Sequence, residues 1–296
     1  MVKHGLAVTL TLCLLIAATA AESGVEMTFY GDSGQRDTNL TSPAYVSEYG
    51  GGSETRLVLV SAGHPARPRP YIKLNMAWSS EDIPDENTIT RGVGVELRPF
   101  SENTWLENAP LLDWLTRARL FVEYGYQSHL RSPKREWVPH EDVAVGLDIW
   151  REYGCADPRW IRPHLEWEQN RPHYWGELNL RVAHHSTNFF IEGYNSTRTV
   201  LNLKAGCRIG ETRLPVMPYL VADFVGSSSG YRFYWENRLL GGVGVRTEIP
   251  IGRDSKVKLY MESVRVIGYL KDKPSAAADV ADYDVRGGII CQVNRY

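Results

Sequence analysis

A histidine and a serine lie two positions apart in the stretch RVAHHSTNFFIEGYNS, which runs from Arg181 to Ser196. Residues i and i+2 of an extended strand share a face, so the side chains of His184 and Ser186 could meet. A histidine that takes the proton of a serine hydroxyl makes that serine a nucleophile, and a third polar group orients the imidazole. Asn188 or Asn195 could supply that group. The stretch therefore admits a hydrolytic site with His184, Ser186 and Asn195 as its residues.

Two other interpretations fit the same residues. A metal site at His184 and His185 is disfavoured, because adjacent histidines on a strand point to opposite faces and no third ligand is visible. The remaining interpretation, a polar strand end without chemistry, is the one that the sequence favours. The choice depends on the elements that surround the stretch.

The first residues predict export. MVKHGLAVTLTLCLLIAATAAES has a basic residue at Lys3, an uncharged apolar run and then small residues, which is the layout of a signal peptide over 1–21. An uncleaved anchor is the alternative, but the run is shorter than the roughly 20 residues of a membrane span. Cys155, Cys207 and Cys291 remain, too far apart for a metal site and odd in number for a disulfide framework.

Alternation with period two dominates residues 22–296, which we predict to form one domain. In GVGVELRPF, the apolar residues Val93, Val95 and Leu97 alternate with Gly94, Glu96 and Arg98. The same pattern recurs in segments that begin near residues 119, 142, 160, 174, 200, 218, 241, 257 and 283, and more weakly near 25, 56 and 71. These segments predict about 12 strands.

Such alternation fits two architectures. A soluble sandwich buries its apolar faces, whereas an outer-membrane barrel turns them to lipid and its polar faces to a lumen. Segments of about 9–12 residues favour the barrel, since sandwich strands are shorter. Tight connections alternate with longer ones, as periplasmic turns and outer loops do. Aromatic residues at strand ends suggest interfacial girdles: Trp150, Trp160, Tyr174, Trp175, Tyr231, Tyr234, Trp235 and Tyr269.

The predicted fold class is therefore all-β, an antiparallel transmembrane barrel of about 12 strands. A soluble periplasmic sandwich that binds carbohydrate is an alternative. One segment, SENTWLENAPLLDWLTRAR, breaks the alternation and fits either a short interfacial helix or a long loop. The net charge of −2 gives no basic stripe for nucleic acid.

Charged residues of both signs occupy the polar faces, where they would set the field of an open lumen or close it with ion pairs. The predicted lumen-lining residues are Arg162, Glu166, Glu168, Arg181, Lys204, Arg208, Arg246 and Glu248.

Several segments resemble a known family. GVGVELRPF, DWLTRARLFVEYGY, YWENRLLGGVGVRTEIP, KLYMESVRVIGYL and YDVRGGIICQV are similar to the C-terminal barrel of the bacteriophage N4 adsorption protein A family, which belongs to outer-membrane barrels associated with exopolysaccharide secretion. The resemblance covers roughly Gly92 to the end. It implies a non-enzymatic, porin-like or secretion-associated barrel that phage can use for adsorption. The implied partners are outer-membrane lipid and lipopolysaccharide, with polysaccharide or secretion-system proteins. The segment before Gly92 is too short for the periplasmic helical repeats that family members usually carry.

The His184 stretch also resembles two families of outer-membrane lipid hydrolases, phospholipase A and lipid A deacylase, which place a histidine and a serine two residues apart near a strand end, facing lipid. Those families follow the serine with Asn-Gly or similar small residues, whereas Thr187 and Asn188 stand here. The resemblance implies a lipid esterase as the alternative function, with calcium as its only implied cofactor. Otherwise no cofactor is expected.

Overall fold

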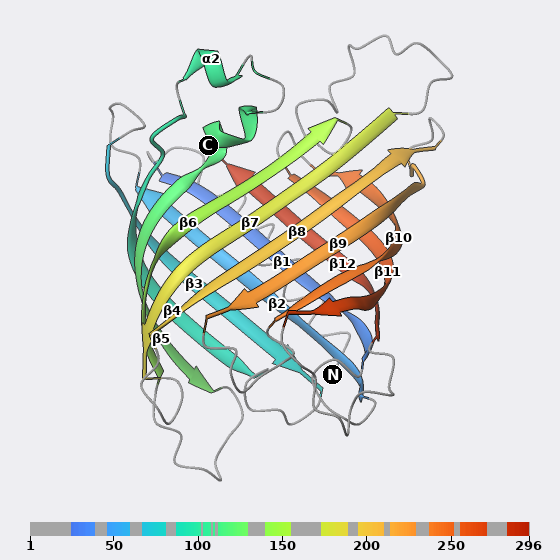
Figure 1. Cartoon of the computed structure of the whole chain (residues 1–296), viewed down its shortest axis with the longest axis horizontal. Helices are drawn as coiled ribbons and strands as arrows, with labels where there is room; N and C mark the ends of the chain where they lie inside the picture. The colour runs from blue at the N-terminus through green and yellow to red at the C-terminus, as the bar shows by residue number, and fades with distance from the viewer. Residues whose placement is uncertain are drawn as a thin grey trace.

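The computed structural model describes residues 25–38, 46–59, 67–80, 87–101, 103–107, 109, 112–129, 140–154, 173–188, 195–209, 214–228, 237–251, 255–270 and 283–295. The described strands form a closed barrel in which each pairs antiparallel with its neighbours in sequence and the first pairs with the last (Figure 1). They are β1 (Val25–Thr38), β2 (Val46–Leu59), β3 (Arg69–Ser79), β4 (Thr88–Leu97), β5 (Arg119–His129), β6 (His140–Gly154), β7 (His173–Thr187), β8 (Asn195–Arg208), β9 (Met217–Ser227), β10 (Arg238–Pro250), β11 (Ser255–Tyr269) and β12 (Tyr283–Arg295).

This closure confirms the 12-stranded antiparallel barrel. The sandwich alternative is wrong, because a sandwich is two packed sheets, whereas here the pairing of β1 with β12 makes one sheet that closes on itself. We call the end of the barrel at which β1 begins and β12 ends the terminal end, and the opposite end the far end.

Ion pairs identify the inner face of the wall, because side chains on non-neighbouring strands can meet only inside the barrel. Lys204 on β8 and Glu262 on β11 form such a pair. Successive side chains along a strand point to opposite faces, so on each strand every second residue points outward. The outward side chains of Val93, Val122 and Val243 are 55%, 52% and 58% exposed. The wall therefore has a polar, ion-paired interior and an apolar exterior, as the alternation predicts.

Two tyrosines pack against glycines on the inner face. The sequence GVGV occurs in both β4 and β10. A Cβ atom at Gly94 would overlap the ring of Tyr71, and one at Gly244 would overlap the ring of Tyr219. Each ring thus lies close to the backbone of the next strand, where only glycine leaves it room.

Some sequence-based expectations differ from the structure. β2 begins at Val46, whereas the alternation starts only near residue 56, because the first part of β2 is polar and rich in glycine. The segment Ser101–Arg119, for which the sequence fits a short helix or a long loop, contains two one-turn helices, α2 (Thr104–Glu107) and η2 (Asp113–Arg117). The predicted strand near 160 and the predicted signal peptide lie outside the described residues.

The prediction of an aromatic girdle is wrong for Trp175 and Trp150, which point into the lumen. Trp175 is two residues from inward-facing Glu177, so it points into the lumen, where it is 4% exposed and stacks edge-on against Tyr219. Trp150 lies opposite Asn179, a residue that lines the lumen. Tyr174 does face outward and is 74% exposed. Tyr269 ends β11. Trp160, Tyr231, Tyr234 and Trp235 lie outside the described residues.

Candidate functional site: the ion-paired lumen

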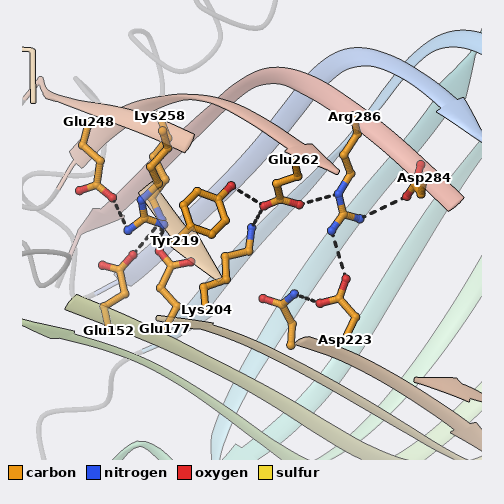
Figure 2. Close-up of polar contacts among 12 residues, drawn as sticks. Glu152, Glu177, Lys204, Tyr219, Asp223, Glu248, Lys258, Glu262, Asp284 and Arg286 are labelled. Atoms are coloured by element: carbon orange, nitrogen blue, oxygen red, sulfur yellow. Dashed lines mark hydrogen bonds and ion pairs between the residues drawn. The ribbon is translucent and has the colours of Figure 1, made fainter. Parts of the chain in front are cut away.

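A network of ion pairs crosses the lumen near the terminal end. The carboxylate of Glu152 on β6 accepts hydrogen bonds from the ammonium groups of Lys256 at 2.7 Å and Lys258 at 2.9 Å. Both lysines are on β11, five strands away around the barrel. Figure 2 shows the side chains of Glu152 and Lys258 reaching toward each other from separate strands. A contact between walls so far apart means that side chains bridge the lumen at this level.

The same network continues onto β7 and β10. Lys258 also pairs with Glu177. The guanidinium of Arg246 joins Glu177 at 2.7 Å to Glu248 at 2.6 Å, and it stacks on the Trp175 ring at 3.5 Å. The exposed fraction is only 1% for the side chain of Lys256 and 2% for that of Glu152. We call this set the plug: Glu152, Glu177, Arg246, Glu248, Lys256 and Lys258.

Further along the lumen, Glu262 on β11 organises a second group of contacts. It accepts hydrogen bonds from Lys204, from Tyr219 at 2.6 Å and from Arg286 at 2.6 Å. Arg286 extends the group to Asp223 at 3.1 Å (Figure 2). Apart from the pair of Glu262 and Arg286 on adjacent strands, these contacts join strands that are not neighbours, so they narrow the lumen from one side.

The opposite wall carries a third group around Glu96 on β4. This carboxylate is fully buried and lies 3.3 Å from Arg56, 3.2 Å from Arg98 and 3.6 Å from Arg119. One buried acid among several guanidinium groups is a costly arrangement unless each partner is held in place. The sequence contains a signal for this group, since Glu96 occupies the polar phase of GVGVELRPF, but it was absent from the predicted lumen set.

A cavity of about 510 Å³ occupies the lumen toward the far end. Its wall includes Tyr30, Asp32, Asn179, Tyr260 and Arg286. The lining is polar and carries both charge signs, and the volume lies within the usual range for small-molecule sites. The plug therefore crosses the lumen near the terminal end, and the cavity lies beyond it toward the far end.

The structure places the predicted lumen residues as follows. Arg181, Lys204, Arg246 and Glu248 are on the inner face, and Arg181 stacks over the Phe121 ring at 4.7 Å. Arg208 ends β8 on the inner face and makes no ion pair with any described residue. The remaining three, Arg162, Glu166 and Glu168, lie outside the described residues.

The His184 and Ser186 side chains lie on the outward face near the far end. Ser186 is directly opposite Asn195 in the register of β7 and β8, so the three predicted residues do gather on one surface. However, His184 Nδ1 bonds Thr197 Oγ1 at 3.1 Å, and no hydrogen bond among the described residues joins His184 to Ser186. His185 points inward, where its Nδ1 lies 2.8 Å from Asp142.

The described residues contain no group of three or more His, Cys, Asp or Glu side chains arranged to hold a metal ion. Within the same residues, no helix is long and apolar enough to cross a membrane.

Comparisons with known proteins give weak similarities. No family model matches the sequence, and no curated protein matches it. Among solved structures, the chain is similar to the translocator domain of the autotransporter NalP from Neisseria meningitidis, at 10% identity and a TM-score of 0.38, covering 99% of this chain and 96% of that one. The β domain of the Bordetella autotransporter BrkA gives 13% identity and 0.35, covering 91% and 99%. An outer membrane channel from Pseudomonas putida F1 gives 9% and 0.37, covering 93% and 97%. At these scores the barrel assignment rests on the strand pairing alone.

Proposed function

We propose that this chain is an outer-membrane barrel of porin-like type whose lumen is closed at rest. The apolar exterior supports the membrane location, because soluble monomers rarely expose such a continuous apolar surface. On β7 this surface ends where Leu178, Leu180 and Val182 give way to His184 and Ser186. A change from aliphatic to polar side chains along one strand is typical of the boundary between lipid tails and headgroups.

The observation that supports a closed lumen is the contact of Glu152 with Lys256 and Lys258. These side chains meet across the lumen and are almost completely buried, so under this proposal they block the path of water at this level. Passage of a solute through this proposed channel would require the plug to rearrange. The cavity beyond it would hold a polar solute that enters from the far end.

A conductance measurement tests this proposal. We expect the wild-type protein to fractionate with outer membranes, to migrate faster on gels before boiling than after, and to show almost no current in planar lipid bilayers. The double variant Glu152→Ala/Lys256→Ala removes one acid and one base, which keeps the charge balanced, and it should produce resolved open-channel steps. Arg208→Ala, a change at the same end outside the plug, should stay closed. Porin-like currents through the wild-type protein would contradict the closed lumen.

The outward-facing residues His184, Ser186 and Asn195 favour a second candidate function, a lipid esterase. The register places Ser186 opposite Asn195, and Thr197 orients His184. Under this candidate, Ser186→Ala should abolish calcium-stimulated release of fatty acid from phospholipid vesicles, by a factor of about 10³ or more. Ser128→Ala, which removes an outward serine of β5 at the same end of the barrel, serves as the control. Equal hydrolysis by wild type and Ser186→Ala would remove the candidate.

A role in exopolysaccharide secretion or phage adsorption stays a prediction of the sequence resemblance. So do the lipopolysaccharide, polysaccharide and secretion-system partners.

A further inference from the structure

The inner face of the barrel at the far end brings together a carboxylate, an imidazole and a hydroxyl from three neighbouring strands. Asp142 is on β6, His185 on β7 and Ser196 on β8. Asp142 Oδ2 lies 2.8 Å from His185 Nδ1. Ser196 lies directly opposite His185 in the register of β7 and β8. All three residues have the inward phase of their strands, which is set by Glu152, Glu177 and Lys204.

The imidazole of His185 has one nitrogen engaged by the carboxylate. Asp142 holds Nδ1, which leaves Nε2 as the nitrogen that can take a proton from a hydroxyl group on β8. Directly opposite residues on antiparallel strands have Cβ atoms about 4.5–5.5 Å apart, which is within reach of a histidine and a serine. Neither Nε2 of His185 nor Oγ of Ser196 has a hydrogen-bond partner among the described residues. As far as the described residues are concerned, both groups are therefore available to each other and to a substrate.

The strands that carry these residues are held together beyond the ladder itself. Asn188 Oδ1 accepts a hydrogen bond from the backbone N–H of Glu141 at 2.7 Å, and Thr187 Oγ1 donates to the carbonyl of Glu141 at 2.8 Å. The backbone N–H of Thr197 donates to Ser228 Oγ at 2.8 Å. These contacts fix the start of β6 and the start of β8 against their neighbours. A catalytic arrangement requires supporting contacts of this kind.

We propose that Asp142, His185 and Ser196 form a serine hydrolase site that faces the lumen mouth. Asp142 holds the imidazole with Nε2 unprotonated. Ser196 Oγ attacks the carbonyl carbon of an ester while its proton passes to Nε2. The bond from that carbon to the alcohol oxygen then breaks, and the alcohol leaves with the proton from Nε2. Water attacks the acyl-serine, gives one proton to Nε2 and releases the acid, and Ser196 recovers its proton.

Arg198 completes the site. It is two residues from Ser196 on the same inward face, its side chain is exposed, and it forms no ion pair with any described residue. An unpaired guanidinium next to the nucleophile can stabilise the negative oxygen that forms during attack. Because the surrounding face is polar and open to water, the expected substrates are water-soluble esters rather than membrane lipids. This site requires only the barrel and its register, and does not depend on the plug.

Covalent labelling tests the proposal in the full-length protein folded in detergent. With a fluorophosphonate probe, we expect one adduct on wild type, mapped by peptide mass to Ser196, as the Oγ–P bond forms and fluoride leaves. Ser196→Ala should lose the adduct and reduce hydrolysis of p-nitrophenyl acetate by at least about 10³-fold to background. Ser128→Ala, a serine on the outward face of β5 at the same end of the barrel, should keep both. Unchanged gel heat-modifiability shows that each variant folds.

Asp142→Asn separates a positioning role from a structural one. It should lower kcat by a factor on the order of 10²–10⁴ and leave KM nearly unchanged, because the amide stabilises the wrong imidazole tautomer. Failure of wild type to react with the probe, an adduct on Ser186, or wild-type hydrolysis in Ser196→Ala would each overturn the proposal. A conducting wild-type lumen would refute the closed channel without affecting this site.

Discussion

Replacing Glu152 with alanine is expected to lower the free energy of unfolding by about 3–5 kcal/mol. Glu152 is a direct partner of both Lys256 and Lys258, and all three side chains are buried inside the lumen. Without this carboxylate, the two ammonium groups remain buried away from water and have fewer carboxylates to compensate their charge. The cost of an unpaired buried charge exceeds the usual value of an ion pair on a protein surface, which is about 0–1 kcal/mol.

Urea unfolding of the barrel in lipid vesicles, followed by tryptophan fluorescence, measures this effect. The double variant Glu152→Ala/Lys256→Ala should recover part of the lost stability, since it removes an acid and a base together. The single variant Arg208→Ala should change the unfolding free energy by less than about 1 kcal/mol, because Arg208 forms no ion pair with the described residues. If Glu152→Ala unfolds like the wild type, the plug does not contribute to stability.

Adding one methyl group at Gly244 is expected to cost about 1–3 kcal/mol of stability, which is the usual range for overpacking. The Cβ of Gly244→Ala would overlap the ring of Tyr219. That ring cannot move freely, because its hydroxyl donates to Glu262 and its edge packs against Trp175. The substitution therefore disturbs the ring and the second group of ion pairs at once.

A double-mutant cycle identifies the ring as the cause. In a Tyr219→Ala background, Gly244→Ala should cost at least about 1 kcal/mol less than it does alone. Gly268→Ala is the matched control, because a Cβ at Gly268 meets no atom within 4 Å. Equal costs for Gly244→Ala in both backgrounds would show that the ring does not set the requirement for glycine.

The sequence was enough to predict which side chains of the barrel wall point inward and which point outward. In β7, period-two alternation puts Leu178, Leu180 and Val182 on one face and Glu177 and Arg181 on the other, and the structure has the same faces. Period-two alternation is a local property, so it is readable wherever one face is apolar. It failed over the first part of β2, where both faces are polar or glycine.

The pairings inside the lumen could not be predicted in the same way. Glu152 and Lys256 are 104 positions apart in sequence, and their meeting depends on the register of every strand between them. Alternation shows which side chains point inward. It does not show which of them lie at the same level along the barrel axis and so can meet. For the same reason, the sequence placed His185 opposite to His184 but gave no indication that Asp142 and Ser196 flank it.

The ladder between β1 and β12 couples the two ends of the barrel sequence during folding. It runs from Met27 paired with Arg295 to Thr38 paired with Asp284. One edge of β1 pairs with β2, but its other edge stays unpaired until β12 has been synthesised. Before β12 is complete, β1 and β11 each present a row of unpaired backbone groups, which is a template for pairing with other chains. Such long-range closure folds slowly. During assembly, the unpaired edges of β1 and β11 therefore need protection from pairing with other chains. This need ends only when β12 pairs with both strands.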